Sequence, residues 1–364
     1  MGTDSEGKEL KHLLRRISRR SFLKGAVGVA AFGGLGTTPL ACGFGGTGQP
    51  AGPKTLKVMM NGGAYETLSR KLVVEPFEKK HGVSVEITPG NSSEMVSRLK
   101  AEKASPTQDL VIIDDFPAAV LIGEGLVEKV NADNVPNMKD LAPEALDPEG
   151  YGPIVHSHGT IIVYNKELVK VKPPESWADL WKPEYKGMVV PPAINIAQGV
   201  LFLLQAAMMN GGGYDNIEPG FEAVKKLAPN IRKYWKAIGD VRPMFDEAVF
   251  VITGTNIWND EASKGRPVAA AFPVEGALAA PARAEIVKGT KAKDLAEKFI
   301  DAYLSPEVQA GWSRDYAISV FNKKASIPPE VQAKMAKKLV VFDSNKIAKN
   351  QAAWVERWMR EIQG

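Results

Sequence analysis

Alternation of strand and helix patterns over residues 55–113 restricts the fold more than any other feature of the sequence. Apolar runs suited to strands are separated by stretches with helical periodicity, and the third run is uninterrupted, as expected for a buried parallel strand. The predicted order is strand 55–60, helix 65–81 closed by Gly82, strand 83–87, helix 92–103 and strand 109–113. This order is typical of a doubly wound α/β sheet.

Doubly wound sheets bind ligands beyond the carboxyl ends of their strands, so the loops 61–65, 89–93 and 114–116 are the first candidates for a site. Gly62-Gly63 has no third glycine before the predicted helix, which leaves a plain tight turn as an equal alternative to phosphate binding. Asp114-Asp115 could orient an amino group or could only cap a helix. The candidates from these loops are Gly63, Tyr65, Ser93, Asp114, Asp115 and Phe116.

The remainder of residues 54–364 has length enough for a second domain. Residues 151–165 are predicted to be an extended crossing segment, and 249–253 a buried strand. Residues 267–273, a short strand between prolines, are a candidate return to the first domain. Further helices are predicted at 198–210, 217–228, 295–304, 331–339 and 351–362.

A different pattern occupies residues 1–42. Arg19 and Arg20 precede an uncharged stretch at 25–41. Five glycines lower the hydrophobicity of this stretch, and it is shorter than a membrane span of about 20 residues. This is typical of a twin-arginine signal peptide, so we expect export to the periplasm. The leader also carries the whole net charge of +4, so the balanced remainder predicts no binding to nucleic acid.

Cys42 is the only cysteine of the chain and follows the uncharged stretch directly. It could be lipid-modified, with 43–53 as a flexible tether, although Pro39 departs from the usual cleavage box; conventional cleavage nearby is the alternative. In both cases residues 54–364 contain no thiol, which excludes disulfides and cysteine nucleophiles there.

Three segments carry a resemblance to a known family: 176–187 (SWADLWKPEYKG), 123–127 (GEGLV) and 304–309 (LSPEVQ). With the order of the predicted elements, they resemble the periplasmic solute-binding proteins of ABC importers, in particular the spermidine/putrescine-binding-like group. The resemblance implies a type II periplasmic-binding-protein fold, in which crossing strands join two doubly wound α/β lobes with a cleft between them. It places lobe 1 at 54–157 and 275–320, lobe 2 at 158–274, and C-terminal helices that pack across the lobes at 321–364.

The resemblance also suggests site residues. Tyr65 and Phe116 match aromatic residues that line the polyamine cleft, whereas a tryptophan of the first loop falls on Gly62. The acidic pair that holds ligand amines falls on 193–196, which reads Ala-Ile-Asn-Ile and includes Asn195, and a further aspartate falls near Ala282. A buried ammonium without a counter-charge is costly, so these losses argue against a linear polyamine.

Other candidates follow from residue chemistry. Arg283 could receive a carboxylate or phosphonate through its planar guanidinium, or could form a structural salt bridge. With Asp114 and Asp115 for an amino group, a zwitterionic solute would fit. His158, two residues after His156, is expected at the cleft edge as a hydrogen-bonding group rather than as a metal ligand. Asn256 and Trp258 follow a predicted strand and could line the cleft, with core packing as the alternative for Trp258.

These features predict a non-catalytic receptor that captures a small polar solute and presents it to an ABC permease. The sequence contains no Gly-x-Ser-x-Gly, Cys-x-x-Cys or His-Glu-x-x-His motif, and we expect no cofactor and no metal. The expected partners are the solute, the permease subunits and the twin-arginine export machinery, with the protein itself a monomer. Spermidine/putrescine binding proper and an exported enzyme remain the alternatives.

Overall fold

The computed structural model describes residues 54–332, 335 and 338–362. Residues 50–364 form one compact unit, to which all the described residues belong. The predictions for the signal peptide (1–42, with Arg19 and Arg20), for the tether (43–53) and for Cys42 therefore lie outside the described residues. Among the helices that are described, none has the length and apolar character needed to cross a membrane.

One mixed sheet runs through the unit, and the described residues contribute ten strands to it. Its order is β2-β1-β3-β9-β5-β7-β6, and the pairing of β1 with β2 and with β3 is parallel. The strands on this path are β1 (Thr55–Met60), β2 (Ser84–Pro89), β3 (Leu110–Asp114), β5 (Ile154–Asn165), β6 (Val189–Val190), β7 (Phe250–Gly254) and β9 (Ala277–Val287). Three short strands, β4 (Val127–Glu128), β8 (Val268–Ala271) and β10 (Leu339–Val340), pair outside it.

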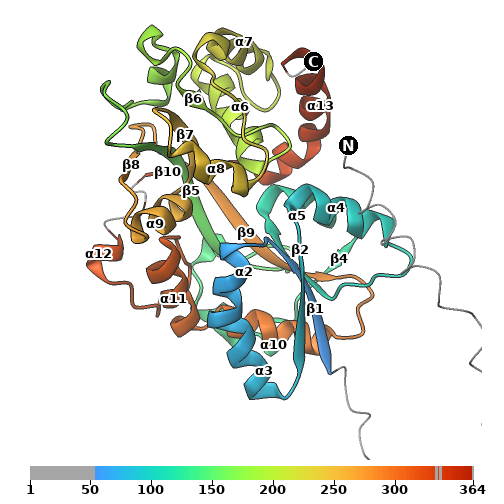
Figure 1. The fold of residues 1–364 in the computed structure, drawn as a ribbon. Helices are drawn as coiled ribbons and strands as arrows, with labels where there is room; N and C mark the ends of the chain where they lie inside the picture. Colours follow the sequence, from blue (N-terminus) through green and yellow to red (C-terminus); the bar gives the residue numbers. More distant parts are fainter. Residues whose placement is uncertain (1–53, 333–334, 336–337, 363–364) are drawn as a thin grey trace, which may run out of the picture. The chain divides into compact units, whose positions relative to one another are not determined.

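The first lobe is built around β1, β2 and β3 with helices on both faces of these strands (Figure 1). Gly82, which ends α3, has φ +66°, the left-handed conformation that suits glycine, as the predicted helix end requires. Phe77 of α3 packs edge-on against Phe299 of α10, with 5.1 Å between ring centroids, in the core of this lobe. The helices are α2 (Ala64–Ser69), the π-turn η1 (Arg70–Val74), α3 (Glu75–His81), α4 (Ser92–Ala101), α5 (Asp115–Gly123), α10 (Lys293–Tyr303) and α11 (Pro306–Tyr316), with short 3-10 turns η2 (Ala132–Asn134), η3 (Pro136–Asp140) and η4 (Pro143–Ala145).

The second lobe packs its helices around β6 and β7. Trp177, in the segment that resembles the solute-binding family, is fully buried and donates its indole N–H to the carbonyl of Gly276 at 2.9 Å. Ser176 and Asp179 form the capping box of this turn, so the motif acts structurally. The elements are η5 (Trp177–Trp181), η6 (Pro183–Tyr185), α6 (Ala197–Met209), α7 (Glu218–Leu227), η7 (Ala228–Asn230), α8 (Ile238–Met244) and α9 (Thr255–Ser263).

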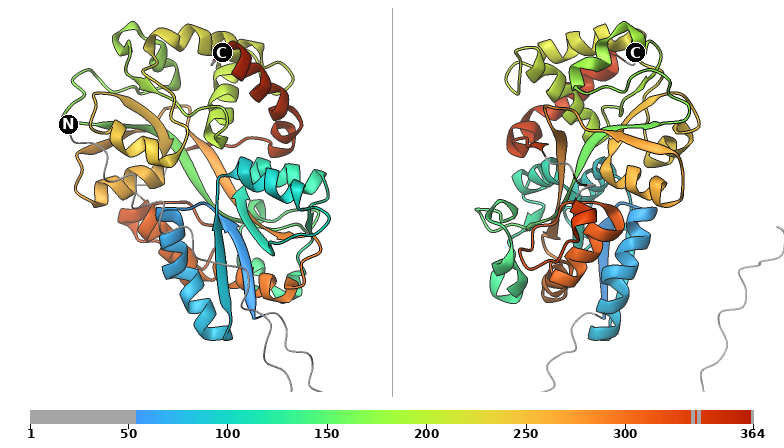
Figure 2. Two further views of the ribbon diagram at one scale, coloured as in Figure 1. Left: turned by 45° about the vertical axis from the view of Figure 1, so that its right-hand side comes forward. Right: turned by 90° about the vertical axis from the view of Figure 1, so that its left-hand side faces the viewer.

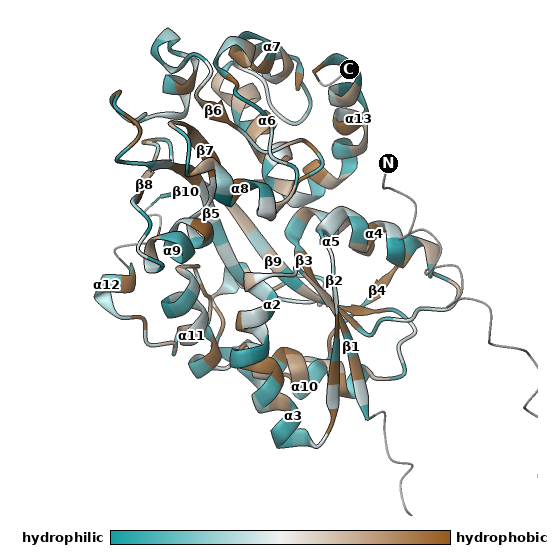
Figure 3. Ribbon diagram, in the orientation of Figure 1, coloured by the Kyte–Doolittle hydropathy of each residue, from teal (hydrophilic) through white to brown (hydrophobic). Residues whose placement is uncertain are grey.

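Two long strands connect the lobes, β5 and β9, which pair antiparallel in the middle of the sheet. One end of β9 pairs with β3 of the first lobe, while β5 continues to pair with β7 of the second (Figures 1 and 2). The last helix, α13 (Ser344–Glu361), buries Trp354 and Trp358 in the core of the second lobe and also packs against α5. Figure 3 shows hydrophobic stretches in β1 and β3, a paler and partly hydrophilic β5, and outer helices of mixed character.

Three element predictions differ from the structure. The strand at Val268–Ala271 pairs with β5 and does not return to the first lobe; the return is made by β9, whose run of small residues carried no strong strand signal. The helix predicted at 331–339 is instead α12 (Pro329–Gln332), with Leu339 already in β10. The last helix begins at Ser344, because Asp343 accepts a hydrogen bond from the N–H of Lys346 and so caps it earlier than the apolar pattern suggested.

Candidate functional site

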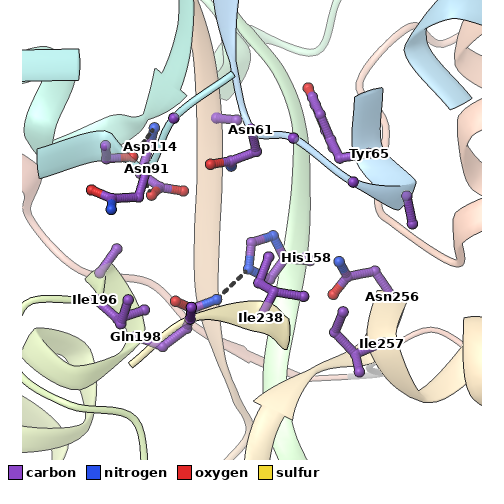
Figure 4. Close-up of a pocket in the computed structure, with 18 of the residues that line it drawn as sticks. Asn61, Tyr65, Asn91, Asp114, His158, Ile196, Gln198, Ile238, Asn256 and Ile257 are labelled. Carbon is purple, nitrogen blue, oxygen red and sulfur yellow. Dashed lines mark hydrogen bonds between the residues drawn. The ribbon is translucent and has the colours of Figure 1, made fainter. Parts of the chain in front are cut away.

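A cavity of about 540 Å³ lies between the two lobes and the crossing strands. Its first wall is made by the loops after β1, β2 and β3, which places it at the carboxyl ends of these strands. Its second wall is made by the segments that lead into α6, α8 and α9. Figure 4 shows the labelled lining residues Asn61, Tyr65, Asn91, Asp114, His158, Ile196, Gln198, Ile238, Asn256 and Ile257.

Asp114 supplies the carboxylate of the first wall. It ends β3 at the start of α5, is partly buried, and accepts a hydrogen bond from Ser92 Oγ at 2.6 Å. Burial raises the pKa of Asp114 above its ordinary value; the Ser92 hydrogen bond opposes this shift and the charge of Asp115 adds to it. Among the described residues no cation pairs with Asp114, so a cationic group in the cavity would be its counter-charge.

The polar residues beside Asp114 are arranged by the start of α4. The side chain of Asn91 accepts from the N–H of Glu94, while the Glu94 carboxylate accepts from the N–H of Asn91 at 2.9 Å. This capping box holds both side chains at the cavity wall. The first wall is therefore acidic and well ordered by local hydrogen bonds.

The crossing strand β5 contributes two histidines, which face the cavity together because they lie two residues apart in a strand. Burial lowers the pKa of His158 to about 4, and its Nε2 lies 3.2 Å from the amide nitrogen of Gln198 on α6. Burial lowers the pKa of His156 to about 3, with the charge of His158 as a second cause. Both imidazoles are therefore neutral near pH 7 and act as hydrogen-bonding groups.

An aromatic cluster backs this end of the cavity. The hydroxyl of Tyr65 lies 2.8 Å from that of Tyr303, which lies 3.3 Å from Nδ1 of His156. Trp312 of α11 packs on Tyr65, with 4.9 Å between ring centroids, and stacks on His156 at 5.5 Å. Burial raises the pKa of Tyr65, so the ring is a neutral, rigid wall.

The second wall is shaped by close backbone approaches. A Cβ on Gly199 would lie 2.1 Å from the carbonyl of Ala193, so glycine lets the 193–196 loop fold onto the start of α6. A Cβ on Gly254 would lie 2.1 Å from Asn256 Oδ1 and 3.1 Å from Cδ2 of His158. Both glycines thus hold lining residues close to the cavity, although neither has an unusual backbone conformation.

Two cations line the second wall and differ in how they are paired. The guanidinium of Arg242 contacts Asp260 at 2.7 Å and Glu261 at 2.9 Å, so its charge is largely offset. Lys236, on the segment before α8, is exposed, and no described carboxylate lies within salt-bridge distance of its side chain. The second wall therefore presents one cation that a ligand could meet.

The structure brings six of the eleven sequence-predicted ligand residues to this cavity. They are Gly63, Tyr65, Asp114, His158, Asn195 and Asn256. Ser93 lies beside it, where its hydroxyl donates to the carbonyl of Asn195 at 3.3 Å across the two lobes. Trp258 is half-buried and packs edge-on against Phe272, with 5.9 Å between ring centroids, which corresponds to its packing alternative.

Arg283 does not line the cavity. It is buried on the other side of β9, where its guanidinium donates to the carbonyl of Gly152 and contacts Asp147 and Glu285 at 2.8 Å each. Side chains alternate along a strand, so the small Ala282 faces the cavity and its neighbour faces away. The salt-bridge alternative describes these contacts, and the role of receiving a ligand carboxylate is corrected.

Asp115 and Phe116 likewise turn away from the cavity at the start of α5. The Asp115 carboxylate accepts a hydrogen bond from Ser344 of α13 and lies 3.4 Å from Arg283. Phe116 is buried in the core of the second lobe. These two residues join the lobes behind the cavity, because α5 packs there against the C-terminal helix.

Several lining residues were not among the eleven individual candidates. Three of them, Asn61, Asn91 and Ser92, lie in the candidate loops 61–65 and 89–93; others are Glu94, His156, Ile196, Gln198, Lys236, Ile238 and Arg242. The spacing Asn91-x-x-Glu94 is a capping-box signal and could have identified the end of the β2 loop. Nothing in the local sequence marks Lys236, whose position depends on the pairing of Pro192 with Trp235. In the part of the chain that the structure describes, no group of three or more His, Cys, Asp or Glu side chains is placed to hold a metal ion.

Comparison with known proteins agrees with this arrangement. The family model for bacterial extracellular solute-binding proteins matches residues 73–338, well over half of the chain. The spermidine/putrescine-binding periplasmic protein of Escherichia coli is 29% identical over 252 residues, 65% of this chain and 70% of that protein. A gamma-aminobutyric acid-binding protein of Pseudomonas aeruginosa is 23% identical over 293 residues, 77% of this chain and 81% of that protein. The crystal structure of an ABC transporter protein from Clostridium perfringens is similar with a TM-score of 0.69 and 27% identity, covering 84% of this chain and 99% of that one.

Two lobes that enclose a polar cavity define a solute receptor. The chain belongs to the bacterial extracellular solute-binding protein family. The fold class expected from the sequence, a periplasmic-binding-protein fold of two α/β lobes with a cleft, is confirmed, as is the function of a substrate-binding component of an ABC transporter. Relatives of this chain are named as periplasmic binding proteins.

Proposed function

We propose that the protein captures a small organic solute bearing an amino group in the cavity between its lobes and delivers it, chemically unchanged, to ABC permease subunits. The observation that carries this proposal is the carboxylate of Asp114, which faces the cavity without a described cationic partner. A partly buried carboxylate is costly unless a counter-charge reaches it, and an ammonium group would provide one. Binding of the ammonium group would then offset the free-energy cost of burying the Asp114 carboxylate.

Capture needs the two lobes to close on the solute. The crossing strands β5 and β9 connect them, so a small change at these strands would move one lobe against the other. We propose that the moving parts are 54–157 with 275–320 on one side and 158–274 on the other, with 321–364 packing across them. His156, His158 and Tyr65 of the aromatic cluster are neutral near pH 7. They would therefore orient the solute by hydrogen bonds and packing and not by charge.

Spermidine or putrescine is the second candidate, because relatives bear that name. A linear polyamine carries an ammonium at each end, and the second wall would have to offer a carboxylate to the far end. The 193–196 loop contains none, and the lining residues of that wall include Lys236 and Arg242. The structure therefore favours a solute with one cationic end.

Export and anchoring belong to the same proposal. We propose that Arg19 and Arg20 direct the precursor to the twin-arginine machinery, that the protein works in the periplasm as a monomer without cofactor or catalysis, and that Cys42 is a candidate for lipidation. The variant Arg19→Lys/Arg20→Lys should leave the precursor in the cytoplasm. Metabolic labelling with palmitate, compared with Cys42→Ala, decides whether the cysteine is acylated.

Calorimetric titration of the purified protein with a panel of amines, amino acids, phosphonates and sugars tests the proposal. We expect at least one amine-bearing compound to bind, and Asp114→Asn to weaken it at least tenfold. Asp133→Asn, which changes an exposed carboxylate outside the cavity, is the matched control and should bind normally. Binding confined to compounds without an amino group, or turnover of any bound compound, would contradict the proposal.

A further inference from the structure

The two walls of the cavity carry charges of opposite sign. On the first lobe, Asp114 and Glu94 line the cavity, and neither pairs with a described cation. On the second lobe the lining charges are Lys236 and Arg242, and Arg242 is already paired with Asp260 and Glu261. A solute that spans the cavity therefore meets a carboxylate at one side and an ammonium at the other.

The helices that face the cavity show the same difference. Those of the first lobe each carry an acidic residue in the first turn, namely Glu66 in α2, Glu94 in α4 and Asp115 in α5. In the second lobe, α6 and α9 have neither an acidic residue in the first turn nor a side-chain cap, whereas α8 has Asp240 in its first turn. Free N–H groups at a helix start attract negative charge, and an acidic residue there offsets this attraction. The starts of α4, α6 and α9 thus reinforce the charge of the side chains on their walls, whereas Asp240 offsets this effect at α8.

Lys236 is the lining cation of the second wall whose side chain has no described carboxylate within salt-bridge distance. It lies before α8, and Asp240 binds the N–H groups of Lys236 and Ala237 as a cap, without contacting the ammonium of Lys236. Its ammonium is therefore available to a ligand. Ile238, 39% exposed, and Ile257 line the same wall and would contact an apolar spacer between two charged ends (Figure 4).

We propose that the solute is a short zwitterion, an amine joined through an aliphatic spacer to a carboxylate or related anion, with its ammonium at Asp114 and its anionic group at Lys236 and the start of α6. This inference rests on the proposed function and narrows its substrate class. Because Asp114 and Lys236 belong to different lobes, one solute molecule of this kind would contact both walls at once. A diamine would place its second ammonium against Lys236, where like charges repel.

Matched series of compounds test this directly. Calorimetric titration would compare ω-amino acids of three to six carbons with the diamine, the monoamine and the carboxylic acid of the same length. We expect an ω-amino acid to bind at least tenfold more tightly than each of its three analogues at one or more lengths. We expect Lys236→Gln to weaken the amino acid about tenfold and to change the monoamine less than twofold. Lys233→Gln, an exposed lysine outside the cavity, is the control and should change neither.

The outcomes separate this inference from the proposed function. If a diamine binds at least as tightly as the amino acid, or if Lys236→Gln strengthens diamine binding without affecting the amino acid, the zwitterion is overturned while capture of an amine at Asp114 stands. If the acid alone binds as tightly as the amino acid, the inference is also overturned. If no amine binds and Asp114→Asn changes nothing, the proposed function itself fails.

Discussion

Ser93 of the first lobe donates a hydrogen bond to the main-chain carbonyl of Asn195 in the second lobe, over a distance of 3.3 Å. The two residues lie at the starts of α4 and α6, directly beside the cavity. The bond can form only when the lobes are close together. In the proposed closing motion it is a contact of the closed state, donated by a side chain that does not line the cavity.

The variant Ser93→Ala should loosen the closed state. A neutral hydrogen bond contributes about 1 kcal/mol, so we expect the solute to dissociate about fivefold faster with little change in its association rate. Stopped-flow measurement with a bound solute would show this. Ser97→Ala removes a hydroxyl that bonds only within α4, to the carbonyl of Ser93, and is the control. Equal dissociation rates for Ser93→Ala and the unmodified protein would contradict a role in closure.

Affinity for an amine-bearing solute should fall as the pH is lowered. Burial raises the pKa of Asp114, so its carboxylate is protonated at a higher pH than an exposed aspartate and then loses its attraction for an ammonium. We expect proton release on binding, which grows toward low pH and is measured by calorimetry in buffers of different ionisation enthalpy. Asp114→Asn should abolish it. His158, with a pKa of about 4, contributes only at lower pH.

Glu285 should make the protein less stable as the pH rises through the neutral range. Burial raises its pKa from 4.5 to about 7 in the folded protein, although the charge of Arg283 opposes the shift. Between these values the unfolded chain releases the proton first, so this group lowers the free energy of unfolding as the pH increases from 4.5 to 7. The buried histidines act in the opposite direction, because their pKa values are lowered.

The difference between the protein and Glu285→Gln isolates that contribution. The amide of this variant would keep an oxygen that can accept from the N–H of Gly152, as the glutamate does at 3.0 Å. Denaturant unfolding at pH 5 and pH 8 should show a larger loss of stability for the unmodified protein than for the variant. The same loss in both proteins would mean that Glu285 does not titrate in this range.

Gly254→Ala should damage the site more than the fold. The new Cβ would lie 2.1 Å from Asn256 Oδ1, the end of a side chain that can swing aside, and 3.1 Å from Cδ2 of His158, so we expect a loss of stability of about 1 kcal/mol, the low end of the cost of overpacking. Asn256 would then leave its position at the cavity and solute affinity should fall severalfold. Gly213→Ala, where a Cβ meets nothing within 4 Å, should affect neither property. Unchanged affinity in Gly254→Ala would remove Asn256 from the site.

The sequence predicted the sheet and the first wall of the cavity, because both depend on local patterns. The strand ends at Asn61 and Asp114 follow from apolar runs, and a ligand is expected there for any doubly wound sheet. Arg283 was misplaced because its neighbour Ala282 faces the cavity, and the facing of a strand residue depends on pairing that the sequence does not specify. Lys236 was missed because it comes from a loop that tertiary contacts alone bring to the cavity.

The central claim is that two lobes close on a captured solute, and small-angle X-ray scattering with and without a bound amine-bearing compound tests it most directly. We predict a smaller radius of gyration in the presence of the compound, no such change for Asp114→Asn, and recovery of the compound unchanged. Identical scattering curves at saturating solute, or a chemically altered compound, would contradict the account.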